Sequence, residues 1–256
     1  MKCPYFLTFL LVLVVFTSIA PAQNRNVSKK PVKKPVAAQK QETSINSAIV
    51  VDERLAILRA EPSLYARSIQ RMRLGRVVRI SGSKQADGVM FYRVFAMPNN
   101  YGWVQAEAIV SKLRRGDDER LARLLQASDG FEQIETAMLF LEIFSNSPLR
   151  PAILLLLGDL MEEIALKLSQ EATRRLDRRE MAASGAPLHS FYLNYVSLDR
   201  YRRLGLNFVF NSSTQLLHYD GASWREITAK FPTSSEATEA QKRLEALKIK
   251  MEGKSR

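Results

Sequence analysis

The side chains that most often carry out catalysis are scarce in this chain of 256 residues. Its only cysteine is Cys3, and its only histidines are His189 and His218, which belong to no H-E-x-x-H pattern. A hydrolytic metal centre needs about three protein ligands beside an open position, and the chain has no G-x-S-x-G nucleophile or glycine-rich phosphate loop. The neighbouring carboxylates Glu162 and Glu163 do not face each other on a helix. The sequence therefore predicts no catalytic residue, metal site, cofactor or nucleotide, and an enzyme is disfavoured.

Residues suited to binding are easier to find. Three arginines lie close together around one turn, and three tyrosines are spread over the same part of the chain. Guanidinium groups form paired hydrogen bonds with carboxylates, and a tyrosine ring offers an apolar surface with a polar tip. The predicted ligand-binding residues are Tyr65, Arg71, Arg73, Arg76, Tyr92 and Tyr101. The alternative is that the tyrosines are packing residues and the arginines form an ordinary solvated surface.

Residues 47–112 must position that site. Short apolar runs rich in β-branched and aromatic residues alternate here with turn sequences such as Pro98-Asn99-Asn100. Strands at this spacing are typical of a small β-barrel. We expect Gly75 at a tight turn and Gly102 where two backbones approach closely. Trp103 is expected in the barrel core.

The same stretch resembles the bacterial SH3-like domain family in three sequence elements. The first is an apolar-Arg-x-x-Pro-Ser element, Leu58 to Ser63, and the second is a Leu-Gly turn at Leu74-Gly75. The third is a closing Gly-Trp-Val, found at Gly102 to Val104. The chain departs from the family in having Glu61 in place of the common Gly and Phe91-Tyr92 in place of Trp-Tyr. This resemblance implies an SH3-like barrel over residues 47–112 that contacts cell-wall peptide or a protein partner.

The N-terminal residues predict export. Lys2 precedes an apolar run over residues 5–20, and a small-residue site, Ala20-Pro21-Ala22, follows it. This pattern is typical of a secretory signal peptide, here residues 1–22. The protein is then periplasmic or at the cell surface; the alternative is an uncleaved run that anchors it to the inner membrane. Residues 23–46 repeat KKPV and contain no aromatic residue, which predicts a disordered linker.

The net charge of +12 is unevenly distributed. Residues 47–115 contain twelve Lys and Arg against five Asp and Glu, and the linker is also basic. Residues 116–256 are nearly neutral. Because export separates the protein from nucleic acid, we expect the basic half to meet an anionic surface of the cell envelope, with the linker as one possible contact.

From Gly116 onward the hydrophobic period becomes helical. We expect helices beginning near Asp129 and Pro151, over residues 192–210 with an interruption, and over 221–230. A last helix is expected from Thr233 to about Met251. The turn at Phe231-Pro232, followed by an Ala-rich helix, resembles the turn of a tetratricopeptide hairpin. Residues 116–256 are therefore predicted to form a helical, tetratricopeptide-like domain, without a regular repeat array.

Together these features predict a multi-domain protein in which an all-β SH3-like barrel precedes all-α helical hairpins. The leading functional hypothesis is non-catalytic binding in the cell envelope, in which the barrel contacts cell-wall peptide or protein and the helices act as a protein scaffold. The first alternative is a purely protein-directed periplasmic scaffold or accessory subunit. The second is a cell-wall enzyme whose catalytic residues follow no familiar pattern.

Overall fold

The computed structural model describes residues 46–112 and 114–252. The predicted signal peptide lies outside the described residues, as does all of the predicted linker except Asn46. The alternative membrane anchor over residues 5–20 also lies outside them. Within the described ranges, none of the helices is both long enough and apolar enough to span a membrane.

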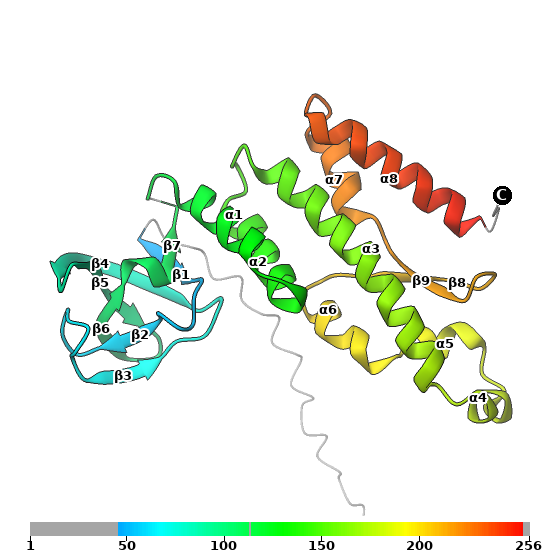
Figure 1. Ribbon diagram of the computed structural model, residues 1–256, viewed down its shortest axis with the longest axis horizontal. Helices are drawn as coiled ribbons and strands as arrows, with labels where there is room; N and C mark the ends of the chain where they lie inside the picture. Colours follow the sequence, from blue (N-terminus) through cyan, green and yellow to red (C-terminus); the bar gives the residue numbers. More distant parts are fainter. Residues whose placement is uncertain (1–45, 113, 253–256) are drawn as a thin grey trace, which may run out of the picture. The chain divides into compact units, whose positions relative to one another are not determined.

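The first part of the described chain is a seven-stranded sheet whose pairings are all antiparallel (Figure 1). Its strands are β1 (Ser47–Val50), β2 (Ile57–Arg59), β3 (Ser68–Arg71), β4 (Val77–Ala86), β5 (Val89–Ala96), β6 (Asn100–Gln105) and β7 (Ile109–Ser111). They are hydrogen-bonded in the order β3-β2-β6-β5-β4-β1-β7, and a short 3-10 helix, η1 (Ala106–Ala108), precedes β7. The predicted β-module is therefore confirmed as a sheet. The edge strands β3 and β7 are not paired with each other, so its hydrogen bonds do not close a barrel.

Two glycines have the roles expected from the sequence. Gly75 has a φ of +76° in the turn before β4, a conformation that side chains with a Cβ rarely adopt. Gly102 lies where β6 pairs with β2, and a Cβ there would lie 2.6 Å from the carbonyl oxygen of Arg59. Only glycine fits this crossing, because a contact that short is far inside the van der Waals distance.

Strand β1 contributes to two hydrophobic cores. Ala48 and Val50 belong to the core inside the sheet, whereas Ile49, and Val51 directly after the strand, belong to the cluster that the helices form. Successive side chains of a strand point to opposite faces. A strand that is buried on both faces therefore needs apolar residues at consecutive positions, without polar residues between them. Val110 of β7 joins the helical cluster in the same way.

The rest of the described chain is mainly helical. Its helices are α1 (Asp117–Ala127), α2 (Gly130–Ile143), α3 (Arg150–Arg175), α4 (Arg178–Ser184), α5 (Leu188–Leu193), η2 (Val196–Leu198), α6 (Asp199–Arg203), α7 (Ala222–Lys230) and α8 (Ser235–Met251). The helices predicted to begin near Asp129 and Pro151, and the last two predicted helices, agree with α2, α3, α7 and α8. Pro151 lies in the first turn of α3, where its missing N–H has no partner to lose.

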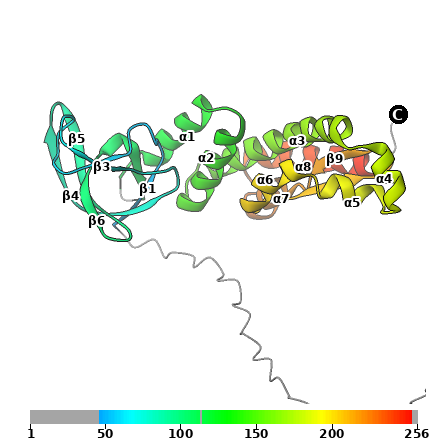
Figure 2. The same ribbon diagram turned by 90° about the horizontal axis from the view of Figure 1, so that it is seen from below.

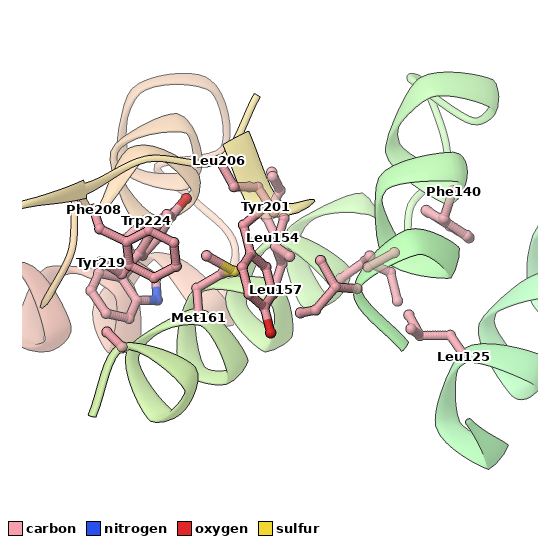
Figure 3. Close-up of a cluster of buried hydrophobic side chains, with 14 of the residues drawn as sticks. Leu125, Phe140, Leu154, Leu157, Met161, Tyr201, Leu206, Phe208, Tyr219 and Trp224 are labelled. Carbon is pink, nitrogen blue, oxygen red and sulfur yellow. The ribbon is translucent and has the colours of Figure 1, made fainter. Parts of the chain in front are cut away.

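Helix α3 lies at the centre of this part and contacts α2, α7 and α8 (Figures 1 and 2). Figure 3 shows Met161 of α3 beside Tyr219 and Trp224 within one continuous cluster of buried side chains. Tyr219 and Trp224 meet edge to face with ring centroids 5.5 Å apart. Gly158 makes room for this arrangement, because a Cβ at that position would lie 2.2 Å from Nε1 of Trp224.

The prediction of an all-α second part was wrong at one place. Residues 192–210 were expected to be helical with an interruption, but the structure has the end of α5, then η2 and α6, and then the first strand of a β-hairpin. Its strands are β8 (Phe208–Asn211) and β9 (Leu216–Tyr219), and they pair only with each other. β9 contacts α3, which covers the apolar side chains of the hairpin. A four-residue strand has about as many residues as one turn of a helix. In so short a segment the apolar residues fit the pattern of a helix as well as that of a strand.

Candidate functional site

The candidate site is the outer face of the sheet, which is the face turned away from the sheet's own core. In an antiparallel sheet, residues paired directly across strands have their side chains on the same face. One row across the sheet pairs Arg79 with Phe95 and Phe95 with Tyr101. A second row pairs Arg93 with Trp103 and Trp103 with Arg59. The outer face thus contains two neighbouring rows in which arginines adjoin aromatic rings.

The aromatic residues of this face form a platform. Phe95 and Tyr101 have ring centroids 4.6 Å apart, and Tyr101 is 62% exposed. Trp103 is only half-buried, because it lies between buried Gly102 and Val104 and therefore points away from the core. The prediction that Trp103 belongs to the core was wrong, since the alternation along β6 reserves the core for its two neighbours.

The arginines differ in how they are held. Arg59 donates a hydrogen bond from Nη1 to the carbonyl oxygen of Ala66 at 3.0 Å, which fixes it under the β2–β3 loop. Arg79 and Arg93 are exposed, and neither guanidinium has an ion pair with any residue that the structure describes. Two guanidinium groups on this face are therefore available to a ligand.

A β-bulge keeps Arg93 uncovered on one side. The register of β4 and β5 shifts between Ile80 and Gly82, so that Gly82 stands opposite Arg93. A bulge inserts one extra residue and re-aims the side chains around it. A Cβ at Gly82 would lie 4.0 Å from Cβ of Arg93, so a larger residue there would pack against the stem of Arg93, and glycine does not.

No acidic residue lies on any of the seven strands, whereas five basic residues do. The strand residues with positive charge are Arg59, Arg71, Arg79, Lys84 and Arg93. The sheet itself therefore presents positive charge without a carboxylate on its strands to neutralise it.

Two carboxylates of this part, Asp52 and Asp87, lie in loops and already have hydrogen-bond partners. Burial raises the pKa of Asp52, but the hydrogen bonds from Arg54 outweigh it and lower the pKa overall. Hydrogen bonds from the Ser63 hydroxyl and the Leu64 amide lower the pKa of Asp87. The carboxylates of Asp52 and Asp87 therefore stay ionised at neutral pH and are held by these hydrogen bonds.

The structure distributes the six predicted site residues over several surfaces. Tyr101 belongs to the outer face, and Arg71 lies at its edge because it pairs with Ile57, which shares a face with Arg59. Tyr65 is 89% exposed in the β2–β3 loop. The six residues therefore do not form one site.

The other three predicted residues lie elsewhere. Arg73 and Arg76 lie in the loop before β4, where Arg76 donates a hydrogen bond from Nη2 to the carbonyl oxygen of Met97. Tyr92 is on the opposite side of the sheet, next to the core, because it alternates with the outward-facing Arg93.

The sequence reasoning missed most of the outer-face residues, although the sequence contains a signal for them. Arg93 and Phe95 are two residues apart, as are Tyr101 and Trp103. Spacing by two places such residues on one face of a strand. The residues between them, Val94 and Gly102, are aliphatic or small, which indicates that the opposite face of each strand faces the core.

In the part of the chain that the structure covers, no group of three or more His, Cys, Asp and Glu residues is arranged to hold a metal ion. Comparison with models of protein families, with curated proteins and with solved structures finds no match to this chain.

Proposed function

We propose that this protein is a non-catalytic binding protein of the bacterial cell envelope that holds anionic cell-wall peptide on the outer face of its sheet. The observation that carries the proposal is the pair of rows in which Arg79 and Arg93 adjoin Phe95, Tyr101 and Trp103. A protein with this function would be exported, as the N-terminal residues predict.

The chemistry of the face suits such a ligand. Wall peptides combine carboxylates with small apolar side chains and adjoin sugar rings. A guanidinium group binds a carboxylate through two parallel hydrogen bonds, while an aromatic ring contacts the apolar side of a peptide or sugar. The absence of acidic residues from the strands means that a carboxylate ligand meets little repulsion there.

We also propose that the sheet is an SH3-like module. The pairing of the first strand, β1, with the last, β7, supports this assignment, because it brings the two ends of the module side by side, although the edge strands β3 and β7 stay unpaired with each other. The three sequence elements at Leu58–Ser63, Leu74-Gly75 and Gly102–Val104 also support it.

The proposal is tested by co-sedimentation of the full chain with purified cell-wall sacculi. The test variant is Arg79→Gln/Arg93→Gln. The control variant is Arg123→Gln/Arg175→Gln, which removes the same charge from two exposed arginines of α1 and α3. At about 0.7 kcal/mol for each exposed ion pair, within the usual range for surface pairs, the two lost pairs together predict roughly tenfold weaker retention of the test variant. The control should change by no more than about twofold.

The basic N-terminal segment needs its own control, since Lys29, Lys30, Lys33 and Lys34 attract anionic surfaces on their own. When these four lysines are also changed to Gln, sacculi should still retain Arg79→Gln/Arg93→Gln less than they retain the control Arg123→Gln/Arg175→Gln. Equal retention of both arginine variants in that background, or no retention of the wild-type chain at low salt, would refute the proposal.

A further inference from the structure

A pocket opens on the side of the sheet opposite the proposed wall-peptide site. Its volume is about 440 Å³, within the range of roughly 300–1,000 Å³ that small-molecule sites occupy. It is lined by Asn46, Ile80, Ser81, Tyr92, Ile109, Ser111, Arg114 and Asp117. Strands β4, β5 and β7 and the start of α1 therefore all contribute to it.

The lining has an apolar part and a polar part. Ile80, Ile109 and the ring of Tyr92 provide the apolar surface, and Ile80 and Tyr92 pack against the core of the sheet. The polar groups come from Ser81 in β4, from Asn46 and Ser111, and from Arg114 in the loop between β7 and α1. Such a combination favours a ligand with an apolar body and one strongly polar end.

Arg114 is oriented by hydrogen bonds. Its Nε donates to Oδ1 of Asp117 at 2.6 Å, and its Nη1 donates to the carbonyl oxygen of Ala106 at 3.3 Å. The hydroxyl of Tyr92 also lies close to this guanidinium. Nη2 takes part in neither of the two bonds given above, and the side chain remains 31% exposed. A guanidinium group held in this way loses little conformational entropy when it binds an anion.

The carboxylate of Asp117 does not cancel this positive charge. Asp117 is 2% exposed, and its Oδ2 accepts a hydrogen bond from the amide of Ser111 at 2.7 Å. Arg120 also lies against it, with Nε 3.3 Å from Oδ1. The oxygens of Asp117 are thus engaged by Arg114, Arg120 and the Ser111 amide, and Glu107 lies near Arg120, so the remaining edge of Arg114 is the cationic group that faces the pocket.

We propose that this pocket binds a small carboxylate that carries an apolar group, with the carboxylate on Arg114 and the apolar group against Ile80, Ile109 and Tyr92. Two kinds of molecule have this chemistry, a free N-acylated amino acid and the C-terminal residue of a peptide. The site is separate from the outer face, so it does not depend on wall binding.

The test is a titration of the full chain with N-acetyl-leucine, in which binding is measured by isothermal titration calorimetry and by protein NMR. N-acetyl-leucine amide is the matched neutral probe, and we expect it to bind at least tenfold more weakly. Acetyl-alanyl-leucine distinguishes the sources: tighter binding than N-acetyl-leucine indicates a peptide C-terminus, and equal or weaker binding indicates a free acylated amino acid.

Variants locate the binding. Arg114→Gln should weaken binding of N-acetyl-leucine at least tenfold, whereas Arg115→Gln, an exposed neighbour outside the lining, should leave it within about twofold. Arg114 also holds Asp117, so loss of folding is a risk for that variant. Ser81→Trp at the exposed rim provides the second variant, because it fills the mouth of the pocket without touching the core.

The proposal is overturned if the acid and the amide bind equally well, or if neither binds at millimolar concentration. It is also overturned if folded Ser81→Trp binds N-acetyl-leucine as tightly as the wild-type chain. A loss of N-acetyl-leucine binding in folded Ser81→Trp supports the pocket. Sacculus retention is not compared for this variant, because Ser81 lies in the bulge beside Arg93 and its hydroxyl donates to the Arg93 carbonyl oxygen.

Discussion

Nδ1 of His218 lies 2.9 Å from Oε1 of Glu162, which joins the hairpin β8–β9 to the central helix α3. Nζ of Lys250 in α8 donates to the same oxygen at 2.7 Å, and the amide of Tyr219 donates to Oε2 at 3.0 Å. An ionised carboxylate only accepts hydrogen bonds, so the proton of the imidazole must be on Nδ1. One carboxylate therefore connects three separate elements.

Acidification should weaken the fold through Glu162. Burial alone raises its pKa, but the hydrogen bonds from His218, Lys250 and Tyr219 outweigh burial and lower it to about 2. A lowered pKa stabilises the fold above the unfolded-state value of about 4.5, and this contribution is lost as the pH falls toward 2. Its size is on the order of 3 kcal/mol. Urea unfolding at pH 7, 5 and 3 measures it.

The neighbouring Glu163 provides the matched control. Glu162→Gln should be less stable than the wild-type chain at pH 7, and should lose less stability on acidification. Among the residues that the structure describes, Glu163 pairs with Lys167 one helical turn away and is 59% exposed, so Glu163→Gln should change the free energy of unfolding by less than about 0.5 kcal/mol. Equal effects of the two substitutions would contradict the assigned role of Glu162.

Gly158→Ala should destabilise the protein, which reverses the usual effect of this change in a helix. Within helices, alanine is normally favoured over glycine by about 0.5–1 kcal/mol. Here the added methyl group would meet Nε1 of Trp224, and overpacking of this kind costs about 1–3 kcal/mol. Thermal unfolding decides the sign, and a raised Tm would show that Trp224 has room to move.

Asp117→Asn should destabilise the junction between β7 and α1. The substitution leaves Arg114 and Arg120 without their shared carboxylate, and removing one partner of a buried ion pair costs about 3–5 kcal/mol. Glu119→Gln is the control, because its 4.0 Å ion pair with Arg123 is exposed. Similar midpoints for both variants in urea would contradict this account.

The two tryptophans should report different events. Trp103 is half-buried on the outer face, whereas Trp224 is buried among the helices. Acrylamide should therefore quench Trp103 in a Trp224→Phe variant more strongly than it quenches Trp224 in a Trp103→Phe variant. Soluble wall fragments should change the emission of Trp103 alone. A change confined to Trp224 would place ligand binding in the helical part.

Helices with long apolar stripes were predictable from the sequence, as was the strand-rich character of residues 47–112. The hairpin β8–β9 was not predicted, because its strands are too short to distinguish a period of two from a helical turn. A usable signal was present, since Phe208–Asn211 and Leu216–Tyr219 flank a polar turn in which Gln215 has a positive φ.

The candidate site was harder to predict than the fold. The sequence gives residue types and spacing along one strand, and these suffice to place Arg93 and Phe95 on a common face. It does not show which strands are neighbours. The rows that join Arg79 to Tyr101 and Arg93 to Arg59 exist only because β6 lies between β5 and β2.

The burial of β1 on both faces limits how recombination can separate the sheet from the helices. A recombination break after Lys112 would leave Ile49, Val51 and Val110 without the helical side chains that cover them. The released sheet would then present an apolar patch to water, which is an aggregation hazard. The sheet and the helices are thus expected to be transmitted as one unit, and a new sheet could replace this one only by matching the helical surface as well.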